Sequence, residues 1–257
     1  EARWTGLDGT SYTHTHTVAA TSTTTTGPSG SATYFATLPP GAELPSGDWC
    51  AARVTPTAET RPANTSANAT RGTSTNDRPS SPHLYSRVDG DFTGTTDELI
   101  QWAACKWGID EDIARAQIAK ESYWWQGAGG DLTTNPNHCH PDVRATPQCP
   151  ESVGLGQVRW RAHSEAFEDS NAITSSAYNL DYTYAVWRDC YDGNLGWLNT
   201  VERGATYSAG DLDGCLGVWF TGRWYVPAAI GYIDAVHTLH DQRVWETTAF
   251  LNWTPPS

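Results

Sequence analysis

The spacing of apolar residues divides the chain into a first part without helical periodicity and a second part that has it. From about residue 95 onward, apolar side chains recur three or four positions apart, as they do on one face of an amphipathic helix. Thr95 and Glu98 have the Thr-x-x-Glu spacing of a capping box. They predict a helix that runs to Cys105 and is stopped by Gly108.

More helices follow in the same pattern. Asp110 is the predicted N-cap of a second helix, with Glu111 and Asp112 at the positive end of its dipole, and this helix runs to about Ser122. The remaining predicted helices start at Ser175 or Ser176, cover residues 195–203 and 212–220, and follow Pro227. The predicted fold class is therefore mainly α.

The first part of the chain is rich in Thr, Ser, Pro and Gly, and its composition changes near residues 90–94. This change predicts an extended arm over residues 1–92 and a helical domain over residues 93–257. Alternation over residues 13–18 predicts one or two short β-strands in the arm. We expect the arm to wrap its own domain, with Trp4, Tyr34, Phe35 and Trp49 as anchors. The alternative is an arm donated to a neighbouring subunit, which implies self-association.

Charge and hydropathy exclude two classes of partner. The 257 residues include 29 acidic and 16 basic side chains, for a formal charge of −13, which disfavours binding to nucleic acid. The chain has no apolar run of about 20 residues, so no membrane insertion is expected. Because the chain begins at Glu1 and contains no methionine, we expect a processed, secreted protein that is extracellular or associated with a cell wall.

The six cysteines are an even number and include no Cys-x-x-Cys pair, which favours three disulfides in an oxidising compartment. Six cysteines allow about 15 connectivities. We favour Cys190 with Cys215, Cys50 with Cys105, and Cys139 with Cys149. A metal site at His138, Cys139 and His140 is the weaker interpretation, since the spacing fits no zinc motif. No metal and no cofactor are expected.

Glu121 is the strongest candidate for a catalytic residue. Ile113, Gln117 and Glu121 lie four positions apart and share one face of the second predicted helix, which points the carboxyl group inward. Burial and the helix dipole both raise the pKa of a carboxyl group at this position, as a general acid requires. The alternative is a solvated residue of the last turn that pairs with Lys120 or Arg115.

A second group of residues begins about thirty positions later. Gly154 and Gly156 allow a backbone to lie close to a ligand, and Gln157 offers both a donor and an acceptor to an amide-bearing sugar. In order along the chain come Glu121-Ser122, Gly154-Leu155-Gly156-Gln157, Asn179-Leu180 with Tyr184, Trp219-Phe220-Thr221-Gly222, and Tyr232-Ile233.

This order resembles the lytic transglycosylase catalytic domain of the goose-type lysozyme-like superfamily over residues 95–246. The family usually has Met at the position of Gly156 and Ala at the position of Ser152. Trp219-Phe220-Thr221-Gly222 keeps only the aromatic character and the final Gly of the family's Tyr-Asn-Ala-Gly.

The resemblance implies a lysozyme-like helical domain that cleaves the β-1,4 bond between N-acetylmuramic acid and N-acetylglucosamine in peptidoglycan. Glu121 would protonate the leaving oxygen and then act as base on the muramoyl 6-hydroxyl, which closes a 1,6-anhydro ring. Tyr232 would hydrogen-bond Glu121, while Ser122, Gly154 and Gln157 would position the substrate. Trp124 and Trp125 are predicted to stack on pyranose rings.

Two alternatives stay open. A hydrolytic lysozyme on the same fold needs a second carboxyl group to activate water, and the candidates are Asp131, Asp142 and Glu151. The other is a wall-associated, self-assembling protein with a weakened site, in which the Thr-rich arm is the functional part.

Overall fold

The computed structural model describes residues 2–5, 11–14, 34–73, 82–201 and 204–255, and the chain forms two compact units, Glu1–Ala32 and Thr33–Ser257. In the first unit, strands β1 (Ala2–Thr5) and β2 (Ser11–His14) pair antiparallel. Of the predicted alternation, residues 13 and 14 lie in β2. The rest of the predicted alternation, residues 15–18, lies outside the described residues, as does the side chain of Trp4.

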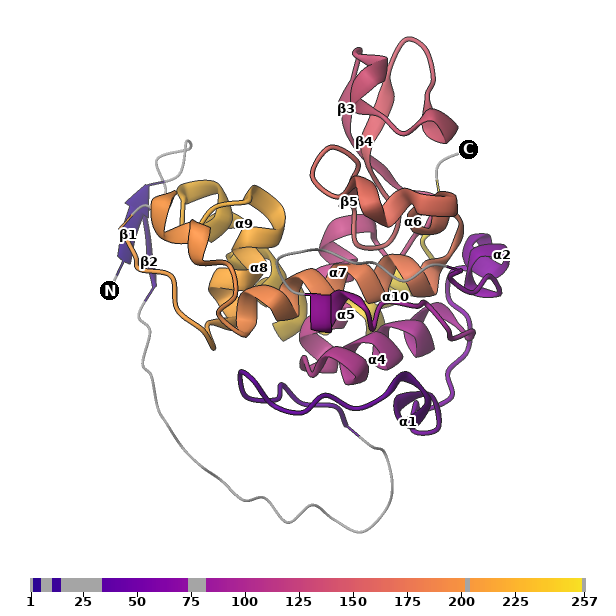
Figure 1. Cartoon of the computed structure of the whole chain (residues 1–257), viewed down its shortest axis with the longest axis horizontal. Coiled ribbons are helices and arrows are strands. Elements are labelled where there is room, and N and C mark those ends of the chain that lie inside the picture. The colour runs from indigo at the N-terminus through magenta and orange to yellow at the C-terminus, as the bar shows by residue number, and fades with distance from the viewer. Residues whose placement is uncertain (1, 6–10, 15–33, 74–81, 202–203, 256–257) are drawn as a thin grey trace. The chain divides into compact units, whose positions relative to one another are not determined.

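The second unit is mainly helical (Figure 1). Its longer helices are α4 (Thr96–Trp107), α5 (Glu111–Ser122), α7 (Ser176–Tyr191), α8 (Leu212–Thr221) and α9 (Pro227–Asp241). Shorter helices are α1 (Gly47–Ala51), α2 (Thr65–Asn68), α3 (Pro82–Tyr85), α6 (Asn171–Thr174) and α10 (Thr248–Leu251). The described residues also form six 3-10 turns: η1 (Pro62–Asn64), η2 (Pro136–His138), η3 (Pro141–Val143), η4 (Ser164–Ser170), η5 (Gly196–Thr200) and η6 (Val244–Glu246).

The helix boundaries follow from local capping chemistry. Thr95 and Glu98 form the predicted capping box at the start of α4, and Gly108 ends that helix in the left-handed conformation with φ 60°. The side chain of Asp110 accepts hydrogen bonds from two backbone N–H groups at the start of α5. The side chain of Ser175 caps α7 in the same way. These predictions are confirmed.

Helix α7 lies in the middle of the second unit and packs against α4, α6 and α8 (Figure 1). Nearly all of its residues are buried, including Tyr178, Leu180, Tyr184 and Trp187. A helix that is buried on every side belongs to the interior of a domain. It supplies the base on which the elements of the functional site rest.

The predicted helix at 195–203 is a short 3-10 turn, η5, and the last predicted helix ends at Asp241, so that Val244 lies in η6. Extended structure was expected only in the arm, but the second unit contains a three-stranded antiparallel sheet. Its strands are β3 (Gly129–Thr133), β4 (Cys149–Val153) and β5 (Val158–Arg159), in the order β3-β4-β5. These strands are short and carry few apolar residues, so no alternating hydrophobic pattern reveals them.

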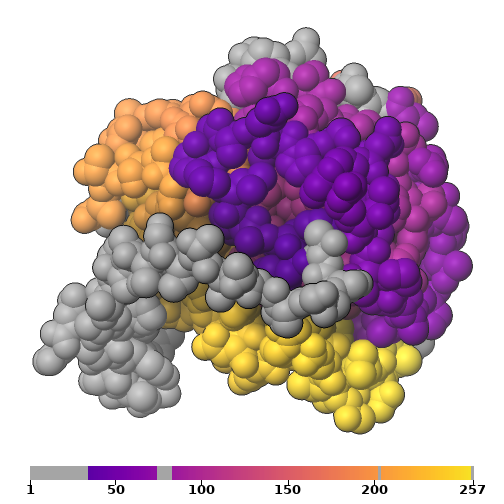
Figure 2. Space-filling model, turned by 90° about the horizontal axis from the view of Figure 1, so that it is seen from below, coloured from indigo at the N-terminus to yellow at the C-terminus, as the bar shows by residue number. Residues whose placement is uncertain are grey.

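The boundary between the two units lies at residues 32 and 33 and not at the predicted 92 and 93. The segment from 34 to 73 lies across one face of the second unit, where Figure 2 shows it in indigo and purple. Phe35, Arg61 and Asn64 are buried, and the Asn64 amide donates to the Trp124 carbonyl at 2.8 Å. Of the other expected anchors, Tyr34 and Trp49 are about half exposed. Polar contacts of this kind leave no trace in composition, which explains the shifted boundary.

Three disulfides join Cys50 to Cys105, Cys139 to Cys149, and Cys190 to Cys215, as predicted. The first ties the segment before α2 to α4, and the third ties α7 to α8. Three disulfides fit a secreted protein. Within the described part of the chain, every helix is too short or too polar to cross a membrane.

Candidate functional site

Glu121 lies in the last turn of α5 and faces a cleft of about 340 Å³. Two sets of elements form the cleft. The helical wall consists of residues on α5, α8 and α9, namely Lys120, Glu121, Trp219, Phe220 and Tyr232. The strand wall consists of residues on the sheet and its turn, namely Gly130, Asp131, Ser152, Gln157 and Arg159.

Glu121 is held from the opposite helix. The hydroxyl of Tyr232 on α9 donates a hydrogen bond to Glu121 Oε1, as the resemblance implies. Phe220 stacks on the Tyr232 ring, with ring centroids 4.7 Å apart and planes inclined by 6°. The carboxyl group, the phenol and the second ring therefore form one packed layer on the helical wall.

The environment of Glu121 raises the pKa of its carboxyl group from 4.5 to about 7. Burial is the main cause, and the negative charge of Asp131 adds to it. The hydrogen bond from Tyr232 and the positive charge of Lys120 act in the opposite direction and lower the pKa, but burial prevails. At neutral pH a substantial fraction of Glu121 therefore carries a proton, which is the state that a general acid needs.

The strand wall places Asp131 in the same cleft. Asp131 on β3 has a positive φ of 51°, and its carboxylate accepts a hydrogen bond from the Ser152 hydroxyl at 2.8 Å. Of the three predicted candidates for a second carboxyl group, Asp131 lines the cleft. Asp142 is bound to Ser170, and Glu151 is bound to Arg159 and His138.

Gln157 also has a positive φ, 55°, and its amide nitrogen donates to the carbonyl oxygens of Gly154 and Ala128 at 2.8 and 3.2 Å. Its side chain is therefore fixed to the backbone at the edge of the cleft. Gly154 has a φ of 82° and packs against the Asn179 side chain, so it shapes this turn without lining the cleft. A Cβ atom at Gly156 would overlap Thr183, which explains why this chain has no methionine at that position.

Besides Gly154, three of the predicted substrate-binding residues lie outside the cleft. The Ser122 hydroxyl is buried and donates to the Ile118 carbonyl at 3.2 Å. Trp124 is 2% exposed and its indole N–H donates to the Arg115 carbonyl. Trp125 lines a separate shallow depression with Ser66. Glu121, Gln157 and Tyr232 are thus the predicted residues that the structure brings together.

A second chamber of about 500 Å³ adjoins the cleft, since Gln157, Arg159, Trp219 and Phe220 line both. Its further walls include His163, Leu195 and Trp197. Phe220 and Trp197 are each about half exposed, and His163 stacks on Trp219 with centroids 5.5 Å apart. Because they share these four residues, the two chambers form one groove that continues from the cleft of Glu121 past Arg159, with aromatic rings along it.

Sequence analysis missed Arg159, which lines both chambers. The signal available was its position two residues after the Gly154-Leu155-Gly156-Gln157 motif. Cys139, the cysteine of the alternative metal site, is joined to Cys149 in a disulfide, and the described residues form no cluster that could hold a metal ion.

Comparison of the chain with protein-family models, with curated proteins and with solved structures finds no match.

Proposed function

We propose that this protein is a secreted enzyme that cleaves the β-1,4 bond between N-acetylmuramic acid and N-acetylglucosamine in peptidoglycan. The observation that carries the proposal is a single carboxyl group, Glu121, with a pKa near 7 on the helical wall of an aromatic-lined groove. The resemblance of the ordered motifs to lytic transglycosylases supports the same reaction. Peptidoglycan strands are the proposed substrate, and no cofactor takes part.

In the proposed reaction, protonated Glu121 gives its proton to the glycosidic oxygen as the bond to C1 breaks. The carboxylate then removes the proton of the muramoyl 6-hydroxyl, whose oxygen attacks C1 and closes a 1,6-anhydro ring. No water is consumed, and Glu121 is protonated again at the end. Tyr232 donates to the carboxylate between the two steps and limits the cost of its burial.

Asp131 favours one alternative, a hydrolytic lysozyme. An inverting hydrolase uses a second carboxylate that activates water at about 6.5–9.5 Å from the acid. Asp131 lies in the same cleft as Glu121 and is oriented by Ser152. Hydrolysis would yield a reducing sugar in place of the anhydro ring.

The test is digestion of purified cell walls with the wild type, Glu121→Gln and Glu168→Gln, followed by mass spectrometry of the released muropeptides. Glu168 is an exposed glutamate outside the cleft and serves as the matched control. We expect Glu121→Gln to abolish release and Glu168→Gln to leave it unchanged. Retained activity in Glu121→Gln would refute the proposal, and products that are 18 Da heavier than the anhydro form would establish the hydrolytic alternative, with Asp131→Asn then as inactive as Glu121→Gln.

A further inference from the structure

Arg159 stands at the border between the two chambers of the groove. It follows Val158 at the end of β5, and its side chain is about half exposed. The only other Lys or Arg that lines the described groove is Lys120, which lies on the opposite wall. The carboxyl groups that line the groove are Glu121 and Asp131 in the cleft and Asp189 in the second chamber. A substrate anion in this groove therefore finds its most favourable position beside Arg159.

The guanidinium group of Arg159 is held in one orientation. Its Nε and Nη2 atoms donate to Glu151 Oε2 at 3.0 and 2.6 Å, while Nη1 makes no hydrogen bond to the described residues. Backbone pairing of Ser152 with Arg159 fixes the base of the side chain. A fixed fork with a free N–H group is suited to a second carboxylate, because guanidinium binds carboxylates through several parallel hydrogen bonds.

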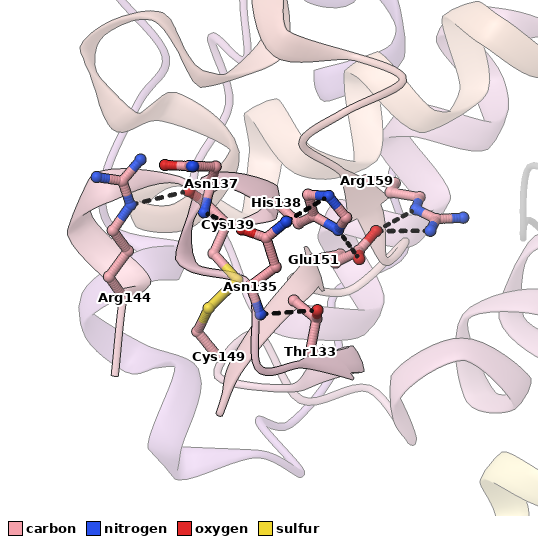
Figure 3. The surroundings of a disulfide bond; sticks show 9 residues. All are labelled: Thr133, Asn135, Asn137, His138, Cys139, Arg144, Cys149, Glu151 and Arg159. Carbon is pink, nitrogen blue, oxygen red and sulfur yellow. Dashed lines mark hydrogen bonds and ion pairs between the residues drawn. A yellow bond between two sulfur atoms is a disulfide. The ribbon is translucent and has the colours of Figure 1, made fainter. Parts of the chain in front are cut away.

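Glu151 is itself fixed from the other side, as Figure 3 shows. Its Oε1 atom lies 3.0 Å from His138 Nδ1, and the other ring nitrogen of His138 lies 3.0 Å from the Asn135 amide nitrogen. Since the Asn135 amide donates, His138 Nε2 accepts, and Nδ1 therefore carries the hydrogen that points to Glu151. Burial would raise the pKa of Glu151, but the hydrogen bonds from Arg159 and His138 outweigh it and keep the pKa below its usual value.

The disulfide between Cys139 and Cys149 brings these residues together (Figure 3). Cys139 follows His138, and Cys149 precedes Glu151 by two positions on β4. The Arg144 side chain also donates to the Cys139 carbonyl at 3.3 Å. The disulfide, His138 and the buried carboxylate of Glu151 together hold the guanidinium group of Arg159 in place in the groove.

We propose that Arg159 determines substrate specificity by binding a carboxylate that is attached to the muramic acid unit. This inference rests on the proposed function. N-acetylmuramic acid differs from N-acetylglucosamine by a lactyl ether, whose carboxylate is free in peptide-free strands and is amide-linked to the stem peptide in intact wall. The stem peptide carries carboxylates of its own. Polymers of N-acetylglucosamine alone offer Arg159 no anion.

The test measures binding by calorimetry in a Glu121→Gln background, so that no ligand is cleaved. Three muramyl-glucosaminyl tetrasaccharides serve as probes: one with free lactyl carboxylates, one in which these are neutral primary amides, and one that carries stem tetrapeptides. If the lactyl group is the anion, the free acid binds about 10- to 100-fold more tightly than the neutral amide, as charge-assisted hydrogen bonds suggest. If the stem peptide supplies it, the peptide-bearing probe has this advantage.

Arg159→Gln should remove that advantage and leave the Kd of the neutral amide within about twofold, whereas Arg159→Lys should keep part of it. Arg161→Gln is the matched control, because Arg161 is exposed and lies outside the residues that line the groove. Thermal melts of each variant show that the fold is retained. The inference would be wrong if Arg159→Gln weakened the binding of the charged and neutral probes equally, or if the protein with Arg159 intact bound all three probes with equal affinity. Neither result would contradict the proposed function. Failure of every probe to bind, together with no release of muropeptides by the wild type, would instead overturn the proposed function and this inference with it.

Discussion

The two walls of the groove are built on different physical principles. Apolar packing holds the side chains of the helical wall in position. Tyr232 is 3% exposed, Phe220 stacks on it, and the helices behind them share the apolar core. The strand wall is set by polar contacts, because β3 is largely exposed and its neighbours are joined by hydrogen bonds, an ion pair and a disulfide.

This difference matches two different tasks in the proposed reaction. Burial on the helical wall raises the pKa of Glu121, although the residue also lines the cleft. The strand wall presents Asp131 and Arg159, whose charges act on a ligand from partly solvated positions. If the helical wall serves proton transfer and the strand wall serves selection, as proposed, variants of one wall should leave the other unaffected. The predictions below test that independence.

The largest effect is expected from the buried ion pair behind the helical wall. Asp181 on α7 is fully buried and accepts hydrogen bonds from Lys106 Nζ, the Trp107 indole and two backbone N–H groups. Asp181→Ala leaves Lys106 buried without this partner, so we expect a loss of about 3–5 kcal/mol in the free energy of unfolding, measured by urea denaturation.

The matched variant on the strand wall is Glu151→Ala. Arg159 is half exposed there, and water can replace the lost carboxylate, so the expected cost is about 1 kcal/mol. Equal losses in the two variants would contradict the distinction between a buried and a solvated wall.

The second effect concerns Glu121, whose environment differs from that of Asp181. Glu121 accepts one hydrogen bond from the described residues, and this bond does not offset the cost of burying its carboxylate. Its folded-state pKa of about 7 lies above the ordinary 4.5, so its stabilising contribution is complete below pH 4.5 and is lost as the pH rises through 7. Glu121→Gln should therefore stabilise the fold increasingly with pH, by up to about 3 kcal/mol above pH 8.

Melting curves between pH 4 and pH 9 measure this difference. Glu43→Gln, at an exposed glutamate outside the cleft, is the matched control for the change from Glu to Gln. A Glu121→Gln variant that is less stable than the wild type at pH 8 would mean that the carboxylate is favourably paired in the folded state.

The contrast between the walls also explains how far the sequence could predict them. The capping box at Thr95, the stop at Gly108 and the stripe that contains Glu121 are local features, which periodicity and capping rules detect. Strand pairing brings Gly129 opposite Val153 across more than twenty residues, and short strands without an apolar pattern give no such signal. The sheet of the strand wall was therefore not predicted, although Gln157 and Asp131 were identified from the sequence as candidate site residues.

Trp124 shows why neighbouring residues can have different environments. Tyr123 and Trp124 both adopt positive φ values, 55° and 64°, so the chain reverses at the end of α5. The Trp124 indole then turns back toward the helix and donates to the Arg115 carbonyl. Sequence identifies a tryptophan next to Glu121, but this backbone reversal depends on contacts such as that between Asn64 and the Trp124 carbonyl, which are distant in sequence.

A third, smaller effect concerns the disulfide of the strand wall. Replacing Cys139 and Cys149 together by Ser opens a short loop, for which chain entropy gives about 2.7 kcal/mol. We expect faster hydrogen exchange of the β3 and β4 amides and weaker binding of the charged probes, with little change in exchange of the α5 amides. Removal of the Cys190–Cys215 bond, which joins α7 to α8, should instead affect the helices. Loss of protection in α5 upon removal of the Cys139–Cys149 bond would show that the walls are coupled.

The smallest effect sharpens the comparison within the helical wall itself. The hydrogen bond from Tyr232 lowers the pKa of Glu121 because it stabilises the carboxylate. Tyr232→Phe removes this donor and keeps the ring on Phe220, so the pKa of Glu121 should rise by roughly half to one unit, equivalent to about 1 kcal/mol.

Because the proposed acid must be protonated, activity in wild type should decline above about pH 7, and the decline in Tyr232→Phe should lie at higher pH. Infrared titration of the Glu121 carboxyl group measures the same shift even where turnover is slow. Tyr225→Phe, which breaks a tyrosine–carboxylate bond to Asp211 outside the cleft, should leave the profile unchanged. A shift toward lower pH in Tyr232→Phe would mean that the phenol stabilises the protonated acid, and the second half of the proposed reaction would then lack its support for the carboxylate.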